Sequence, residues 1–122
     1  MGKILVVDDE TLIITLLERL LKFMEREAVF CTSGKDAEKA LKENIDEIEI
    51  AIVDMNMPET NGLCIAEMIK KTNSDICVFL ASGDPSDLEN GIAKNSEFID
   101  GVLYKPFTIE NIKEVLARVE QD

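Results

Sequence analysis

Five short apolar runs alternate along the chain with segments whose apolar residues recur every three or four positions. The short runs indicate strands, whereas the recurring spacing is that of one helix face. The run at 48–53 lacks the polar–apolar alternation of a strand with one face in water, which is typical of strands covered on both faces. This alternation predicts an α/β fold, with a five-stranded parallel sheet and helices on both of its faces.

The expected elements fill the chain without a linker or repeat, and 122 residues suit one domain, so we expect a single domain over 1–122. The expected strands are 3–7, 28–31, 48–53, 76–81 and 101–104. The expected helices are 11–25, a segment ending near 43, a segment ending near 71, 85–94 and a last one after 108. Side chains suited to capping stand before four helices (Ser33, Asn61, Asp84 and Thr108).

The net charge and the cysteine pattern limit which ligands and metal sites we expect. There are 25 acidic and 13 basic residues, a net charge of -12, whereas nucleic acids and anionic membranes are bound by clustered Lys and Arg. We therefore expect no nucleic acid and no membrane as a direct ligand. Histidine is absent and Cys31, Cys64 and Cys77 are far apart, which argues against zinc sites and Cys/His pairs. We expect buried free thiols and a cytoplasmic location, because the first apolar run is too short for a signal peptide.

Polar side chains follow four of the expected strands at the point where each strand ends. Asp8 and Asp9 follow the first strand, Asp54 the third, Ser82 the fourth and Lys105 the fifth. The carboxyl ends of parallel strands lie along one edge of the sheet, where ligands bind. We therefore expect these residues to meet in one pocket.

The acidic residues of this set indicate a divalent-metal and phosphoryl site. Asp8, Asp9 and Glu10 would repel a phosphate, so their turn predicts either a cation site or an acid-rich helix start. The second reading suits Glu10 but does not explain Asp54, which ends an otherwise apolar strand. A carboxylate can attack phosphorus and form an acyl phosphate, and Mg²⁺ held by neighbouring carboxylates would screen the approaching phosphoryl group. Lys105 could pair with a phosphoryl oxygen.

Several segments together resemble the signature of response-regulator receiver domains, including the chemotaxis regulators. They are Val7-Asp8-Asp9, Asp54-Met55-Asn56-Met57-Pro58 with Gly62, Ser82-Gly83 and Lys105-Pro106-Phe107. The resemblance covers essentially the whole chain. It implies a doubly wound, flavodoxin-like (βα)5 fold with strand order 2-1-3-4-5. It also implies a switch of a two-component phosphorelay, with no enzymatic activity beyond its own phosphotransfer and dephosphorylation.

The resemblance implies a phosphoacceptor and a set of metal ligands. Asp54 would take the phosphoryl group from the phosphohistidine of a sensor histidine kinase or a histidine phosphotransfer protein. Asp9 would bind Mg²⁺ (or Mn²⁺) directly and Asp8 through water. Asp54 and the backbone carbonyl of Asn56 would be further ligands. The phosphorylated domain would then act on a downstream protein target.

The resemblance also implies roles for the residues around the acceptor. Ser82 would donate a hydrogen bond to the phosphoryl group and Lys105 would pair with it. The side chains of Asn56 and Asp84 would tune dephosphorylation. Val102 departs from the pattern, because receiver domains usually carry Tyr or Phe there as a rotamer switch. We therefore expect the signal to depend on the helix over 85–94, whose sparse apolar content predicts weak packing.

Two other functions remain open from the residues. A hydrolase of the haloacid dehalogenase type also forms an aspartyl phosphate, but it needs a second acid where this chain has Asn56. A binding module that keeps the fold without being phosphorylated would not require the full polar set. The chain could also be the regulatory part of a longer response regulator.

Overall fold

The computed structural model describes residues 2–87, 89 and 96–120. Its strands are β1 (Lys3–Val7), β2 (Ala28–Cys31), β3 (Ile48–Asp54), β4 (Cys77–Ser82) and β5 (Gly101–Tyr104). Its helices are α1 (Thr11–Phe23), α2 (Gly34–Glu43), α3 (Gly62–Thr72) and α5 (Ile109–Glu120), with a 3-10 turn η1 (Ser96–Phe98) before β5.

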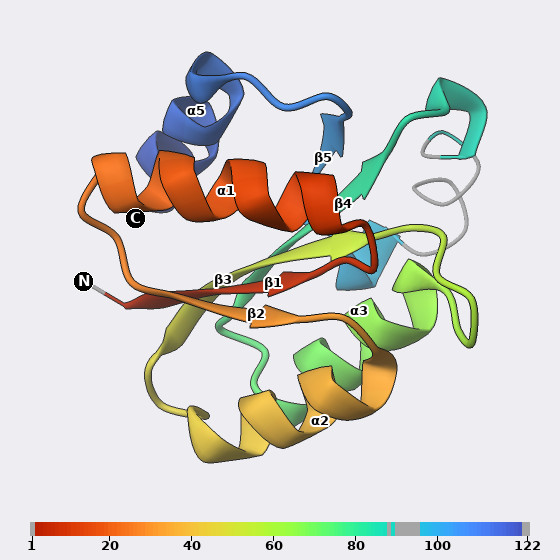
Figure 1. Ribbon diagram of the computed structural model, residues 1–122. Helices are drawn as coiled ribbons and strands as arrows, with labels where there is room; N and C mark the ends of the chain where they lie inside the picture. The colour runs from red at the N-terminus through yellow and green to blue at the C-terminus, as the bar shows by residue number, and fades with distance from the viewer. Residues whose placement is uncertain (1, 88, 90–95, 121–122) are drawn as a thin grey trace.

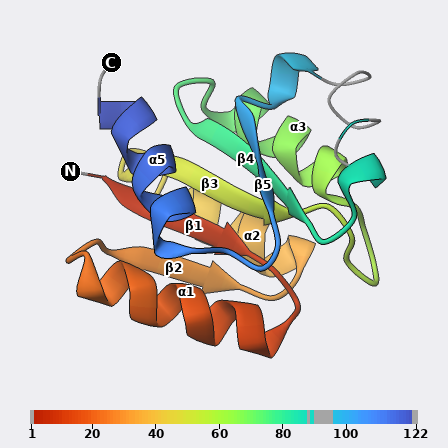
Figure 2. The ribbon, with the colours of Figure 1, turned by 90° about the horizontal axis from the view of Figure 1, so that it is seen from above.

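The five strands form one parallel sheet in the order β2-β1-β3-β4-β5. Helices α1 and α5 cover one face of the sheet, and α2 and α3 cover the other (Figure 1). Seen from above, the strands run side by side between the two helix layers (Figure 2). The predicted doubly wound, flavodoxin-like fold and the strand order 2-1-3-4-5 are confirmed.

The sheet separates two apolar cores, which explains why its central strands read as unbroken apolar runs. Along β1, Leu5 and Val7 join the core that includes residues of α2 and α3. Ile4 and Val6 join the other core, with residues of α1 and α5. Successive side chains of a strand point to opposite faces, so a strand buried on both faces needs apolar residues at every position.

Element boundaries shift by one or two residues from the sequence expectation. Helix α1 ends at Phe23 instead of 25, because Glu25 takes a left-handed backbone with φ 57° that a helix cannot continue. Strands β3 and β4 each run one residue further than predicted, to Asp54 and Ser82. These two polar side chains are therefore held by strand backbone.

The predicted caps form at the helix starts. The side chains of Ser33, Asn61 and Thr108 accept hydrogen bonds of 3.1, 3.0 and 3.1 Å from the amides of Asp36, Cys64 and Asn111. Asp84 accepts one of 2.9 Å from the amide of Ser86. Of the helix expected over 85–94, residues 85–87 and 89 are helical, and the rest lies outside the described residues.

The three thiols differ in exposure. Cys31 is buried as predicted, and burial, with the charge of Asp36, raises the pKa of its thiol to about 11. The prediction of a buried thiol is wrong for Cys64, which is exposed because it lies outside the buried stripe of α3. Cys77 is half-buried. Within the described part of the chain, no helix combines the length and the apolar character that a membrane span requires.

Candidate functional site

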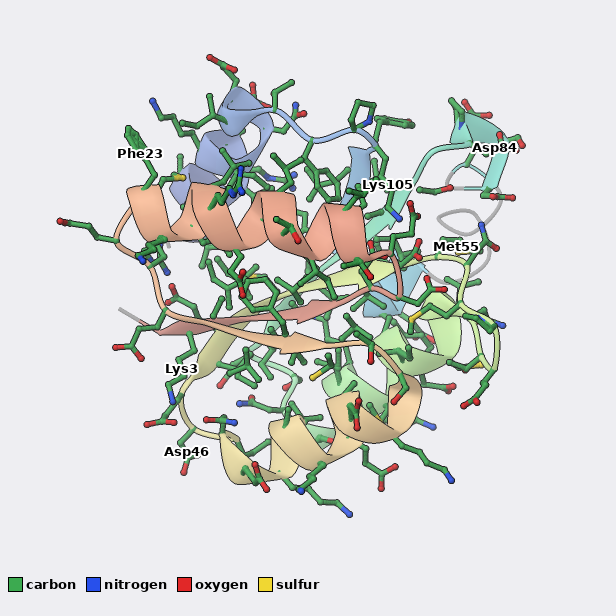
Figure 3. All side chains as sticks on the ribbon, viewed as in Figure 1. Lys3, Phe23, Asp46, Met55, Asp84 and Lys105 are labelled. Carbon is green, nitrogen blue, oxygen red and sulfur yellow. The ribbon has the colours of Figure 1, made fainter. Side chains whose placement is uncertain are left out.

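The carboxyl ends of the strands form one polar edge, as the parallel arrangement requires. The strand register sets the ends of neighbouring strands side by side: Val7 opposite Val53, Asp54 opposite Ala81, and Ser82 opposite Tyr104. In Figure 3, Lys105 and Met55 lie at this edge, and Lys3 and Asp46 lie at the opposite one. Side chains from β1, β3, β4 and the residue after β5 are therefore near neighbours.

Lys105 is the centre of the site. Its Nζ lies 3.0 Å from Oδ2 of Asp8, 3.2 Å from Oδ1 of Asp54 and 2.7 Å from Oε1 of Glu10. The side chains of Asp8 and Asp54 are only 3% and 5% exposed, so these charges are largely removed from water. One ammonium group faces three carboxylates, which leaves excess negative charge at the site.

The electrostatics follow from this burial. Loss of hydration, followed by the charge of Asp8, raises the pKa of Asp54 to about 6. Loss of hydration also raises the pKa of Asp8. For Lys105, burial alone would lower the pKa, but the hydrogen bonds to Glu10 and Asp8 and the charges of Asp8 and Asp54 outweigh it and raise the pKa. Lys105 therefore stays positively charged, and a further cation would stabilise the ionised carboxylates.

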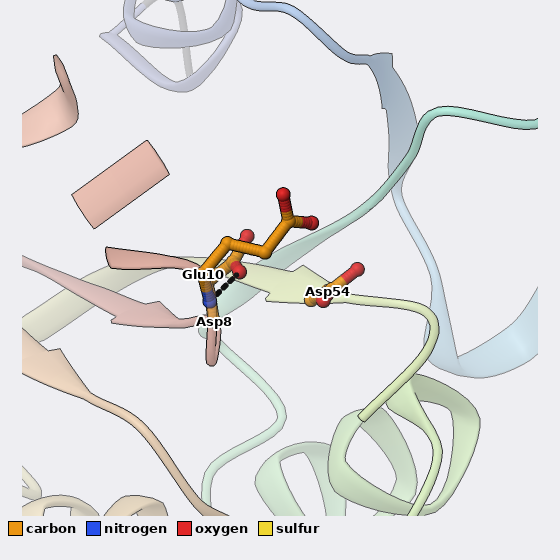
Figure 4. A group of neighbouring side chains, drawn as sticks. All are labelled: Asp8, Glu10 and Asp54. Carbon is orange, nitrogen blue, oxygen red and sulfur yellow. Dashed lines mark hydrogen bonds between the residues drawn. The ribbon is translucent and has the colours of Figure 1, made fainter. Parts of the chain in front are cut away.

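The carboxylates fit a divalent cation. One oxygen each from Asp8, Glu10 and Asp54 can be chosen so that all three lie within 4.8 Å of one another (Figure 4). The amide of Glu10 donates a 2.8 Å hydrogen bond to Oδ1 of Asp8, which fixes the turn that carries both acids. Carboxylate oxygens are the donors that Mg²⁺ and Mn²⁺ prefer.

Asp9 and Glu10, the two acids that follow Asp8, lie in different surroundings. Asp9, which the resemblance made a direct ligand, is exposed and lies outside the three-carboxylate group. It lines a hollow of about 110 Å³ with Ser33, Met57 and other residues of the loops that follow β2 and β3. Glu10 belongs to the three-carboxylate group. It occupies the N-cap position of α1, but its side chain accepts no capping hydrogen bond there.

Asn56 and Ser82 flank Asp54 and meet a residue that sequence reasoning missed. The amide of Asn56 donates to Oδ1 of Asp54 at 3.4 Å, and its side-chain Nδ2 donates to Oδ2 of Asp87 at 2.8 Å. The hydroxyl of Ser82 lies 3.5 Å from the same oxygen of Asp87. No sequence pattern pointed to Asp87, because its contact depends on where the turn after β4 lies.

The remaining predicted residues lie at the border of the site. The amide of Asp84 donates to Oγ of Ser82 at 3.0 Å, but its carboxylate binds Ser86. Hydrogen bonds from the Ser86 side chain and amide lower the pKa of Asp84. Val102 is half-buried against the core that includes residues of α2 and α3, and the neighbouring Tyr104 is exposed.

Gly62 fixes the loop after Asp54 by close approach. A Cβ at this position would lie 2.5 Å from the backbone oxygen of Asp54, 2.8 Å from Cδ2 of Leu80 and 2.9 Å from Cα of Met55. We expect Gly62→Ala to lower the free energy of unfolding by about 2 kcal/mol or more, because two of these contacts are backbone atoms that cannot move alone. Urea unfolding measures the change.

Gly83→Ala is the matched control for Gly62→Ala. Nothing lies within 4 Å of a Cβ at Gly83, on the other side of the site. We expect its effect on unfolding to stay within about 0.5 kcal/mol. Equal losses in the two variants would show that the close contacts at Gly62 relax freely.

Comparison with known proteins agrees with the resemblance seen in the sequence. Residues 4–117 match the sequence model described as response regulator receiver domain. The transcriptional regulatory protein CpxR of Escherichia coli (strain K12) is 32% identical over 120 residues, which cover 98% of this chain and 48% of CpxR. The chain thus spans about half the length of the first curated relatives it matches.

Solved structures share the fold along the whole chain. The crystal structure of a response regulator receiver domain protein from Clostridium thermocellum has 30% identity and a TM-score of 0.89, covering 99% of this chain and 95% of that one. The response regulator protein TrrA from Thermotoga maritima, solved in complex with Mg²⁺-BeF, has 28% identity and a TM-score of 0.85. The match covers 98% of this chain and 99% of TrrA.

Proposed function

The chain belongs to the response regulator receiver domain family, and on that premise we propose that Asp54 is its phosphoacceptor. Receiver domains are regulatory switches of two-component systems. The donor would be the phosphohistidine of a sensor histidine kinase or a histidine phosphotransfer protein. The observation that carries the proposal is the buried Asp54 carboxylate at a strand end, 3.2 Å from the ammonium group of Lys105 and beside Asp8.

The transfer step follows from the chemistry of the two groups. An oxygen of the Asp54 carboxylate attacks phosphorus, an O–P bond forms, and the N–P bond to the donor imidazole breaks. The electron pair of that bond remains on the imidazole nitrogen, and the product on Asp54 is an acyl phosphate. Lys105 keeps its charge and pairs with a negative oxygen of the product, and the Ser82 hydroxyl donates to another.

The site's carboxylates would hold Mg²⁺ or Mn²⁺ during this step. Asp8, Glu10 and Asp54 supply the clustered oxygens, and Asp9 and the Asn56 carbonyl remain predicted ligands. The bound cation would neutralise negative charge on the phosphoryl oxygens as they approach. Its removal by EDTA is therefore expected to abolish phosphorylation.

The output of the switch would be a downstream protein. An acyl phosphate adds roughly two negative charges and new acceptor oxygens at the edge of the sheet. This changes the surface that a partner protein contacts. We propose a single cytoplasmic domain over 1–122 that contacts no nucleic acid itself. That proposal concerns this chain alone, since CpxR, about twice as long, is named a transcriptional regulator.

Phosphorylation by acetyl phosphate with Mg²⁺ tests the assignment. We expect intact-protein mass spectrometry to show one added phosphoryl group that hydroxylamine removes, as it does from acyl phosphates. Asp54→Asn should abolish this addition, whereas Asp75→Asn, at an exposed carboxylate before β4, should not. Addition that persists in Asp54→Asn would contradict the assignment. Absence of addition in every protein would favour a binding module that works without phosphorylation.

A further inference from the structure

Asp87 joins the two polar groups that flank the acceptor. Its Oδ2 accepts a 2.8 Å hydrogen bond from the Asn56 side chain and lies 3.5 Å from the Ser82 hydroxyl. Asn56 is in turn bonded to Asp54 through its own amide. One oxygen of the Asp87 carboxylate is thus the acceptor for the side chains of both Asn56 and Ser82, next to the Asp54 carboxylate that would be phosphorylated.

We propose that Asp87 is a carboxylate latch that holds Asn56 and Ser82 in the unphosphorylated protein and is displaced when Asp54 is phosphorylated. The latch is the set Asp87, Asn56 and Ser82. This inference rests on the proposed function of Asp54. It adds a residue that opposes phosphorylation and that couples the site to the turn after β4.

The competition follows from the number of donors. A serine hydroxyl has one hydrogen to donate, so Ser82 cannot donate to Asp87 and to a phosphoryl oxygen at once. A phosphoryl group also adds roughly two negative charges close to the oxygens of the Asp87 carboxylate, which is unfavourable. Lys105 cannot relieve this repulsion at Asp87, because its ammonium group already contacts Asp8, Asp54 and Glu10.

Displacement of Asp87 would move more than one side chain. The amide of Asp87 donates to the backbone oxygen of Asp84 at 3.1 Å, and the Asp84 carboxylate caps the same turn through Ser86. The Asp84 amide in turn donates to Oγ of Ser82 at 3.0 Å. Release of Asp87 and reorientation of Ser82 would therefore act on the two ends of the turn over 82–87. The latch thus links phosphorylation of Asp54 to the conformation of that turn.

Affinity for beryllofluoride with Mg²⁺, a stand-in for the phosphoryl group, tests the latch by calorimetry. Asp87→Ala should bind about tenfold more tightly than the wild type, since a hydrogen bond to a charged group no longer has to be broken. Asp87→Asn keeps an acceptor without the charge and should fall between them. The control is Glu89→Gln, which removes an exposed carboxylate two residues away and should bind like the wild type.

A second measurement needs neither metal nor phosphoryl group. In EDTA, the losses of urea midpoint in Asp87→Ala and Asn56→Ala should overlap, so that the double variant loses less than their sum. Glu89→Ala combined with Asn56→Ala should instead be additive. Additive losses for Asp87 and Asn56, or equal beryllofluoride affinity in Asp87→Ala and wild type, would overturn the latch.

The two proposals fail in different ways. If wild type is phosphorylated at Asp54 but Asp87→Ala changes neither affinity nor coupling, the latch is wrong and the phosphoacceptor assignment stands. If the wild type is not phosphorylated and does not bind beryllofluoride, the phosphoacceptor assignment fails. Displacement by phosphorylation fails with it, even where the coupling between Asp87 and Asn56 is found.

Discussion

Replacing Lys105 with methionine is expected to lower the free energy of unfolding of the metal-free protein by about 3 kcal/mol at neutral pH. Methionine keeps most of the length of the side chain but removes the ammonium group that contacts Asp8, Asp54 and Glu10. Two of these carboxylates are almost fully buried, and removing one partner from a buried charge cluster leaves the others uncompensated. Urea unfolding in EDTA measures the loss.

The loss in Lys105→Met should depend on pH and on added cations. As the pH falls below about 6, Asp54 takes up a proton and Lys105 loses a charged partner, so the difference between the two proteins should shrink. Saturating Mg²⁺ should also reduce the difference, because a second cation then neutralises the same oxygens. Lys71→Met removes the exposed pair with Glu67 and should cost less than about 0.5 kcal/mol. A similar cost at both lysines would contradict the central place of Lys105.

Asp54→Asn is expected to have the opposite effect and to stabilise the metal-free protein at neutral pH. The folded-state pKa of Asp54 is raised from 3.8 to about 6, a difference that corresponds to about 3 kcal/mol. An ionised Asp54 is therefore less favourable in the folded protein than in the unfolded chain. Asparagine has a similar shape and no charge, so it escapes this penalty.

The pH dependence of this effect has a defined sign. Between about pH 4 and pH 6 the folded protein retains a proton on Asp54 that the unfolded chain has lost, so wild-type stability falls as the pH rises through this window. The advantage of Asp54→Asn should thus be small near pH 4 and reach its full size above pH 7. Unfolding series in EDTA over this range, with Asp75→Asn as the control, measure it. A constant difference across the range would show that Asp54 titrates normally.

The fold and the composition of the polar edge could be predicted because each depends on local sequence. A strand covered on both faces needs apolar residues throughout, so the run before Asp54 indicated both a central strand and the place where it ends. Parallel strands then bring their ends to one edge, and Asp8, Asp54 and Lys105 do lie in contact there. The strand order came from the family resemblance, because periodicity does not say which strands are neighbours.

Other features could not be predicted because they depend on the direction of a side chain within a turn. Asp9 and Glu10 are adjacent acids, and only the backbone of the turn decides that Glu10 faces Lys105 while Asp9 lines the neighbouring hollow. Asp87 reaches Asn56 across a distance of 31 positions in the chain. Cys64 lies in an apolar stretch of sequence, but its position on α3 is beside the buried stripe and outside it, so the thiol is exposed.

Because Cys31 is buried and Cys64 is exposed, alkylation of these two thiols would report on different states of the molecule. Alkylating reagents react with the thiolate. Cys31 is buried in β2, and its raised pKa of about 11 leaves only a small fraction of it as thiolate at neutral pH, whereas Cys64 is open to solvent. At neutral pH such a reagent would modify Cys64 in every native molecule and Cys31 only in molecules that have opened. The ratio of the two adducts therefore records how often the sheet opens at β2.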